Sequence, residues 1–436
     1  MKKVIVSFIA AAIIAATAFV GGCVSFSGVD GRDGKDGQDV SIYECYELAK
    51  QEDPELTIEE FLKKYLSYSG DAVESGFSMQ ASINRSLFSA VSVAAGFEVS
   101  DTNIWGKPSG TKTSWMFGAG VIIDLDKERG DAYVVTNCHV IYTDASAGSR
   151  ISENVYLFLY GQDEDYDIRQ YGIPATVIGA SRTYDIAVLK VQGSEVLKES
   201  NAVAAKFNES DDVYAGEPVY AIGNPETLGV SATQGIISKE SETISVNVSD
   251  VSTDVQQYRV LRTDAAINGG NSGGGLFNAE GELVGIVNAK AAESDIDNMG
   301  YALPASNVKR LVRLMIDTQS KFDGNNTGVY QLYLGAGLTA QGRKVRLEND
   351  RAVISETVCV NNAVSGLEQD DAIRRIVIEN ASGEVVESRE VTRLHHVEDL
   401  LLSAREGYTV KLTVSRAGGL VEVPIAVTQR DLDFVV

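Results

Sequence analysis

Cysteine is scarce in this chain of 436 residues, which contains only Cys23, Cys45, Cys138 and Cys359. These four lie far apart, which excludes both a disulfide framework and the close ligand spacing of a zinc site. We therefore expect buried free thiols at the last three positions. We expect neither a metal nor another cofactor.

Basic residues are also few: 38 Lys and Arg stand against 61 Asp and Glu, for a formal net charge of −23. Nucleic acids and anionic lipid headgroups attract proteins mainly through Lys and Arg. The charge therefore argues against a nucleic-acid partner and against electrostatic binding to a membrane surface.

The N-terminus resembles a bacterial lipoprotein signal. Lys2 and Lys3 precede an apolar run over residues 4–20, and small residues then lead to Cys23. We predict that residues 1–22 are removed and that Cys23 carries a diacylglyceryl group, whose two acyl chains suffice for stable anchoring outside the cytoplasm. The alternative is an uncleaved membrane-spanning anchor, because the run approaches the ~20 residues that cross a bilayer.

Three short segments separate this anchor from the first large domain. Residues 23–41 contain four Gly-x-Asp repeats without proline, which disfavours a collagen helix and predicts a solvated spacer. Residues 42–69 have the capping and apolar pattern of a small helical module. Residues 70–86, rich in Ser, Gly and Ala, are predicted to be a linker.

Residues 87–320 have the sequence pattern of an all-β domain, in which short apolar runs alternate with Gly, Asp and Asn. The runs are Val121–Ile123, Tyr133–Thr136, Val155–Tyr160, Ile186–Val191, Pro218–Ile222, Gly235–Ser238 and Leu283–Val287. A helix is expected after Pro304, where apolar residues recur at 308, 311, 312 and 315.

A glycine-rich loop over residues 263–274, TDAAINGGNSGG, has the features of a nucleophile loop. A serine hydroxyl needs an adjacent general base, and backbone amides must face the oxyanion that forms on attack. Glycines at 270, 273 and 274 allow turns closed to other residues and leave amides unshielded. The alternative is an ordinary turn in which Ser272 is incidental.

Histidine is as rare as cysteine, with three in the chain. His139 ends an apolar strand, whereas His395 and His396 lie far beyond the serine and are expected in a surface loop. His139 is therefore the candidate base for Ser272, although a lone histidine is more often a core residue. Asp185, directly before a predicted strand, could accept a hydrogen bond from the imidazole and fix its tautomer, or could be a turn residue.

These residues and their flanks resemble the HtrA (DegP/DegS-like) family of trypsin-fold serine proteases. The matching segments are TNCHV at 136–140, YDIAVLKV at 184–191, IGNP at 222–225, TQGIIS at 233–238, the loop at 263–274, GELVGI at 281–286 and GYALP at 300–304. The resemblance implies a mainly β fold with two packed six-stranded barrels and a triad in the cleft between them.

The resemblance also implies a role for each site residue. Ser272 would attack the scissile carbonyl, His139 would transfer the proton and Asp185 would orient the imidazole, while the amides of Gly270 and Ser272 would form the oxyanion hole. The specificity pocket would be lined by Ala266, Ile267, Asn288, Ala289 and Lys290. Because position 266 offers no counter-charge to a basic side chain, we expect cleavage after small or medium aliphatic residues.

Residues 328–436 resemble a divergent PDZ domain, a small α+β fold that binds peptide C-termini by adding a strand beside a helix. Its carboxylate loop would be formed by Tyr333, Leu334, Gly335 and Ala336. The segment near 340–360 fits this pattern poorly, and an unrelated α+β domain is the alternative.

The sequence therefore predicts a lipid-anchored, extracytoplasmic serine endopeptidase of HtrA type that cleaves misfolded proteins. The family implies a homotrimer. The main alternative is an inactive protease-like scaffold with a peptide-binding or holdase role. An adhesive surface protein would rest on the Gly-x-Asp repeats alone.

Overall fold

The computed structural model describes residues 71–102, 108–162, 167–208, 212–225, 229–247, 255–288, 299–319 and 327–435, together with residues 50 and 322. The predicted signal, the Cys23 lipid site, the spacer and nearly all of the helical module lie outside the described residues. The chain divides into two compact units, residues 1–80 and 81–436, and the second is described below. Within the described ranges, no helix is long and apolar enough to cross a membrane.

Helix α4 (Asp71–Leu87) occupies the segment predicted to be a linker, so that prediction is wrong. Ser82 and Ser86, one helical turn apart, are buried, and the Ser86 hydroxyl is hydrogen-bonded to the Tyr220 hydroxyl at 2.9 Å. Residues four apart share one face of a helix. The small serines that suggested a linker are therefore the face on which the helix packs.

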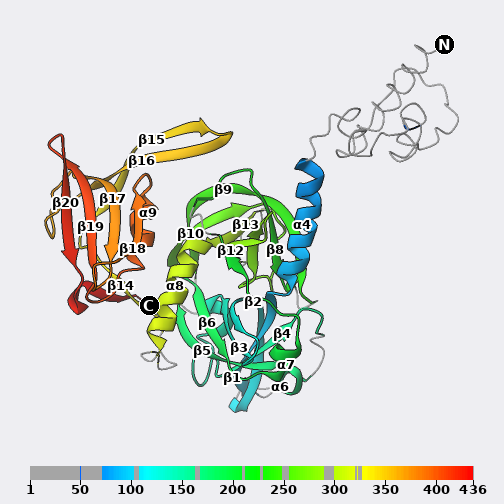
Figure 1. Ribbon diagram of the computed structural model, residues 1–436. Coiled ribbons are helices and arrows are strands. Elements are labelled where there is room, and N and C mark those ends of the chain that lie inside the picture. Colours follow the sequence, from blue (N-terminus) through cyan, green and yellow to red (C-terminus); the bar gives the residue numbers. More distant parts are fainter. Residues whose placement is uncertain are drawn as a thin grey trace, which may run out of the picture. The chain divides into compact units, whose positions relative to one another are not determined.

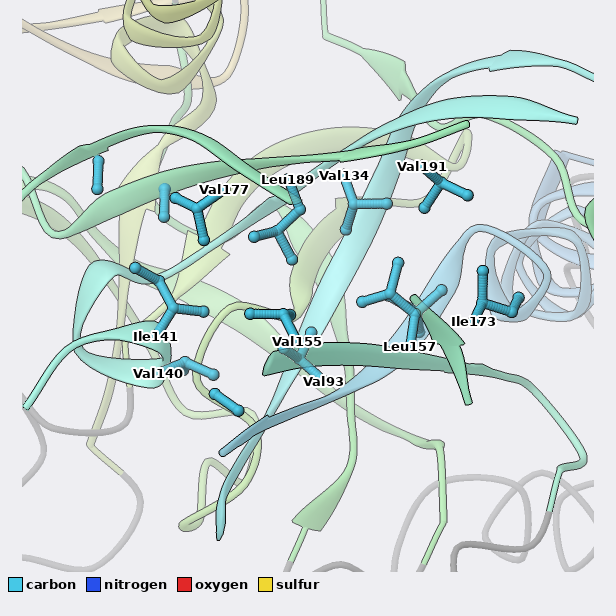
Figure 2. Close-up of a cluster of buried hydrophobic side chains, with 14 of the residues drawn as sticks. Val93, Val134, Val140, Ile141, Val155, Leu157, Ile173, Val177, Leu189 and Val191 are labelled. Carbon is cyan, nitrogen blue, oxygen red and sulfur yellow. The ribbon is translucent and has the colours of Figure 1, made fainter. Parts of the chain in front are cut away.

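The first barrel closes in the order β1-β2-β3-β6-β5-β4 with antiparallel pairing throughout (Figure 1). Its strands are β1 (Ala90–Thr102), β2 (Pro108–Asp126), β3 (Asp131–Thr136), β4 (Asn154–Leu159), β5 (Ile173–Ser181) and β6 (Ile186–Val191). Branched side chains from facing strands fill the interior, among them Val134, Leu157 and Leu189 (Figure 2). Among the described residues, its connections contain the short helices α5 (Cys138–Ile141) and α6 (Ile168–Tyr171), and α7 (Glu195–Glu199) follows β6 on the way to the second barrel.

The second barrel has the order β11-β8-β9-β10-β13-β12-β7, and an additional β11–β12 pairing joins six of these strands into a ring. Its strands are β7 (Lys206–Phe207), β8 (Pro218–Gly223), β9 (Ser231–Asn247), β10 (Val255–Thr263), β11 (Gly275–Asn278), β12 (Glu282–Val287) and β13 (Gly300–Pro304). Strand β7 adds to β12 in parallel. The expected pair of six-stranded barrels is confirmed, as is the helix after Pro304, α8 (Ala305–Asp317), whose residues Val308, Leu311, Val312 and Met315 are buried.

The C-terminal region forms its own sheet and core. Strands β14 (Val329–Leu332) and β21 (Leu432–Val435) pair with each other, and the larger sheet has the order β15-β16-β17-β19-β20, with β18 on β17. Its elements are β15 (Leu338–Glu348), β16 (Arg351–Val360), β17 (Ala372–Glu379), β18 (Val385–Glu390), α9 (Leu394–Leu401), β19 (Thr409–Arg416), β20 (Gly419–Ala426) and the 3-10 turn η4 (Gln429–Asp431). The poorly matching segment is the long β15–β16 ribbon (Figure 1).

His395 and His396 belong to α9, which corrects the prediction of a surface loop. His396 is only 6% exposed. Burial, and then the charge of Arg389, lower the pKa of His396 to about 3. The imidazole is therefore neutral at pH 7.

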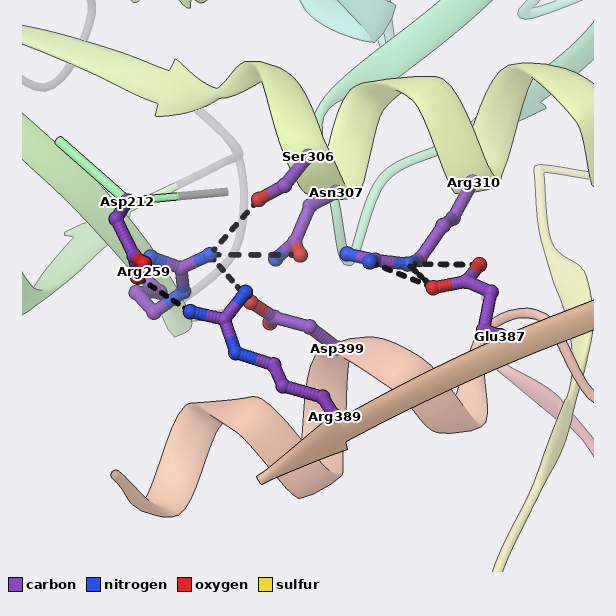
Figure 3. Close-up of polar contacts among 8 residues, drawn as sticks. All are labelled: Asp212, Arg259, Ser306, Asn307, Arg310, Glu387, Arg389 and Asp399. Atoms are coloured by element: carbon purple, nitrogen blue, oxygen red, sulfur yellow. Dashed lines mark hydrogen bonds and ion pairs between the residues drawn. The ribbon is translucent and has the colours of Figure 1, made fainter. Parts of the chain in front are cut away.

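Ion pairs join the second barrel and α8 to the C-terminal sheet and α9 (Figure 3). Arg310 of α8 contacts both carboxylate oxygens of Glu387 on β18, at 2.7 to 3.1 Å. Arg259 of β10 pairs with Asp399 of α9, and Arg389 of β18 pairs with Asp212. Arginine suits such sites because its planar fork matches a carboxylate.

Candidate active site

His139 and Asp185 meet because the strands that carry them are neighbours. Strand β3 ends at Thr136, which pairs with Ala187 near the start of β6. His139 Nδ1 lies 2.7 Å from Asp185 Oδ2, and the His139 backbone N–H donates to Asp185 Oδ1 at 2.9 Å. The carboxylate thus holds both the ring and the main chain of the histidine.

Amide groups complete the surroundings of Asp185, which is 3% exposed. Asn288 Nδ2 donates to Asp185 Oδ2 and Asn137 Nδ2 donates to the Asp185 carbonyl oxygen, both at 2.9 Å. A buried carboxylate is costly without such donors. Asp185 also has φ 49°, an uncommon left-handed conformation that persists only where its neighbours hold it.

Asn288 is the residue whose contact the sequence reasoning missed. It was predicted as a wall of the specificity pocket, whereas its side-chain amide donates to the carboxylate of Asp185. The only local signal is its place directly after β12, the strand that also accepts the Gly273 amide through Val287. A motif search for nucleophile, base and acid does not reach such a supporting residue.

The serine loop lies against the end of β3. The Ser272 carbonyl oxygen accepts from Ala119 N at 2.8 Å, and the Gly273 amide donates to the Val287 carbonyl oxygen at 3.0 Å. A Cβ at Gly273 would lie 2.2 Å from Thr136 Oγ1, and its φ is +86°, so only glycine fits there. Ser272 is therefore held next to the strand end that leads into His139.

The remaining amide predicted for the oxyanion hole belongs to Gly270. Its φ of +91° is a conformation that favours glycine, and the residue is half-buried. Its N–H donates to no other residue in the described part of the chain. The amide is thus available to an incoming oxygen.

The predicted pocket residues are only partly described. Ala266 is exposed, and its carbonyl oxygen accepts from Thr233 Oγ1 at 2.9 Å. Ile267 is half-buried and packs on Gly300. Ala289 and Lys290 lie outside the described residues.

Cys138 precedes His139 but is a buried free thiol. Burial, and then the charge of Asp185, raise the pKa of Cys138 well above its usual value. The thiol therefore stays protonated and does not compete with Ser272 as a nucleophile. Cys359 is also free and half-buried, while Cys45 lies outside the described residues.

The predicted carboxylate loop lies between β14 and β15. Tyr333 is 63% exposed, Leu334 is buried, and Gly335 and Ala336 are half-buried. Strand β15 follows at Leu338 and is paired only with β16, so its other edge is open among the described residues.

Comparisons with known proteins show which proteases the chain is similar to. The model of the trypsin-like peptidase domain family matches residues 118–286. A serine protease Do-like HtrA of Bacillus subtilis (strain 168) is 34% identical over 240 residues, which cover 55% of this chain and 44% of the relative. The chain thus spans less than half the length of that relative.

A serine protease Do-like HtrA of Lactococcus lactis subsp. cremoris (strain MG1363) is 30% identical over 312 residues, which cover 69% of this chain and 68% of the relative. The solved structure of the HtrA-type protease AlgW with a decapeptide is 22% identical and has a TM-score of 0.48, with 80% of this chain and 98% of that chain covered. The sequence match to the Lactococcus protein extends through most of both chains. The chain belongs to the HtrA family of trypsin-fold serine proteases.

Proposed function

We propose that this protein is an active serine endopeptidase in which Ser272, His139 and Asp185 form the triad. The observation that carries the proposal is the 2.7 Å contact between His139 Nδ1 and Asp185 Oδ2, made where the serine loop lies against β3. With Nδ1 bound to the carboxylate, Nε2 is the nitrogen left to accept the Ser272 proton.

The reaction follows from these positions. Ser272 Oγ attacks the peptide carbonyl as His139 takes its proton, and the amides of Gly270 and Ser272 stabilise the oxyanion. His139 then protonates the leaving amine, and water releases the acyl group by the reverse sequence. Asp185 stabilises the imidazolium that forms in each half-reaction.

Misfolded polypeptides are the proposed substrates, cleaved after small or medium aliphatic residues. Ala266 brings no negative charge to the base of the pocket, and Ile267 adds an aliphatic wall. A desolvated Lys or Arg side chain would find no counter-ion there.

The region from 328 to 436 is proposed to bind peptide C-termini as a PDZ-like domain. The open edge of β15 begins just after the loop at 333–336, so a peptide could add as a further strand with its carboxylate on the loop amides.

A lipid on Cys23 would hold the enzyme at the membrane outside the cytoplasm. In that case, labelled fatty acid is incorporated into the wild-type chain but not into Cys23→Ser. The proposed homotrimer predicts three times the chain mass in sedimentation equilibrium.

The decisive test is digestion of β-casein by the wild-type chain and by Ser272→Ala. Cleavage by the wild type alone is expected. Equal rates would overturn the enzyme assignment, and intact casein with suppressed aggregation of a client protein would favour the inactive scaffold.

A further inference from the structure

Tyr184, the residue before the catalytic acid, extends away from the active site. Its hydroxyl donates a hydrogen bond to Gln331 Oε1 of β14, in the C-terminal region. Burial is the main cause that raises the pKa of Tyr184, so the hydroxyl is a desolvated, neutral donor. A desolvated hydroxyl that loses its acceptor becomes costly, which makes this contact energetically significant.

The turn that carries Asp185 is supported differently on its two sides. On the active-site side, Asn137, His139 and Asn288 all contact Asp185. Behind the turn lies a cavity of about 380 Å³, whose lining includes Tyr184, Ile186 and Gln331. Because close packing normally helps to fix a turn, the cavity reduces the packing on this side and leaves more of the support to polar bridges.

Polar bridges cross behind the turn. Tyr258 donates from its hydroxyl to the Arg182 carbonyl oxygen at 3.2 Å, and Tyr184 binds Gln331. Gln331 is itself held in register, because β14 pairs with β21 and the Tyr330 ring packs on Phe434 at 5.0 Å. The support for the Asp185 turn therefore includes a strand from outside the two barrels.

We propose that Gln331 is a positioning residue for catalysis, which acts through the Tyr184 hydroxyl to hold the strained Asp185 turn in its active conformation. The inference rests on the proposed endopeptidase function and extends it. It makes the C-terminal region part of the support of the triad, independently of any peptide that this region binds. Loss of the bridge would let the turn relax toward the cavity, so that Asp185 aligns His139 less often.

The test uses the full chain and a fluorophosphonate probe that phosphonylates Ser272 directly, with fluoride as the leaving group. Tyr184→Phe removes only the hydroxyl and Gln331→Leu removes only the acceptor. Each is expected to lower the limiting phosphonylation rate constant about three- to tenfold, the kinetic equivalent of one hydrogen bond, with unchanged probe affinity. The double variant should be no slower than either single variant, because both remove the same bridge. Tyr160→Phe, an exposed tyrosine that packs on Phe88, is the matched control and should react like the wild type.

The outcomes separate the alternatives. Unchanged phosphonylation in both variants, effects confined to probe affinity, or losses that multiply in the double variant would each overturn the positioning role. Thermal unfolding shows whether a variant is folded, and the two substitutions lie on different elements, so one misfolded variant leaves the other to decide. If the wild type is labelled no faster than Ser272→Ala, the proposed function itself fails, and the inference fails with it.

Discussion

The surroundings of Asp185 and the joint between α8 and the C-terminal sheet are both clusters of polar groups, but they are built differently. Asp185 is surrounded by dipoles: two side-chain amides, one backbone N–H and an imidazole. The joint is built from full charges, Arg259 with Asp399 and Arg310 with Glu387. Dipoles in a buried site fix geometry with little dependence on salt. The ion pairs of the joint are also largely buried, so salt screens them weakly, but removal of one partner leaves a buried charge without its counter-ion.

The largest expected effect tests the catalytic cluster. Asp185→Asn keeps the size of the side chain but replaces a carboxylate by an amide, which allows the wrong imidazole tautomer. In serine proteases of this mechanism such a change lowers kcat by about 10⁴-fold. Ser272 acylation kinetics measure it, with circular dichroism to confirm the fold, and a loss below tenfold would show that Asp185 is not the partner that sets the tautomer.

Asn288→Ala tests whether one neutral donor matters to the buried acid. Hydrogen bonds to charged groups contribute about 1.5–3 kcal/mol, so kcat should fall about 10- to 100-fold. The matched control is Asn201→Ala at an exposed position. Equal activity of both variants would mean that Asp185 is held without this amide.

Asp185 and Asn288 also show how much of the site could be predicted from the sequence. The two barrels, α8 and the meeting of His139 with Asp185 were predictable, because strand runs and short motifs are local and the strands β3 and β6 pair directly. The contact of Asn288 with Asp185 was not, because it joins residues 103 positions apart through a tertiary approach.

Two errors show the same limit of local patterns. Ser82 and Ser86 favoured a linker by composition, yet in α4 they are the small residues that let a helix approach Tyr220. His395 and His396 looked polar enough for a loop, but arginines and burial keep the His396 imidazole neutral within α9. The first outcome depends on Tyr220, a neighbour distant in sequence, and the second depends mainly on burial, which composition does not show.

On the other side of the comparison, Arg310→Ala should loosen the joint while sparing the chemistry. Arg310 is 7% exposed, and its guanidinium donates two hydrogen bonds to the Glu387 carboxylate. Removal of the side chain is therefore expected to lower the free energy of unfolding by about 1–3 kcal/mol. Faster hydrogen exchange in α9 would report it, with less than threefold change in Ser272 acylation. Lys198→Ala, which removes an exposed pair with Glu195, is the control and should change nothing measurable.

The smallest effect is a pH dependence of stability from His396. Since its pKa falls from 6.5 to about 3 on folding, the folded chain binds fewer protons than the unfolded chain below pH 6.5. The free energy of unfolding therefore contains a contribution from His396 that is fully present above pH 6.5 and is lower by about 1.4 kcal/mol at pH 5.5. Asp399, whose pKa burial raises, has the opposite slope, so the contribution is taken as the difference between wild type and His396→Gln in urea unfolding at pH 7.5 and 5.5. Parallel pH dependences would contradict it.

The close contact at Gly273 couples the position of Ser272 to the packing of the two barrels. Ser272 belongs to the second barrel, but its carbonyl oxygen accepts a hydrogen bond from Ala119 of the first barrel. The α-carbon of the next residue, Gly273, packs directly against Thr136 of the first barrel. Because the two barrels approach too closely at Gly273 for a Cβ to fit between them, sliding of one barrel over the other would displace Ser272 before a strand unfolds. Mild heating or a low denaturant concentration should therefore abolish the proposed protease activity while the circular dichroism spectrum is still that of the native protein.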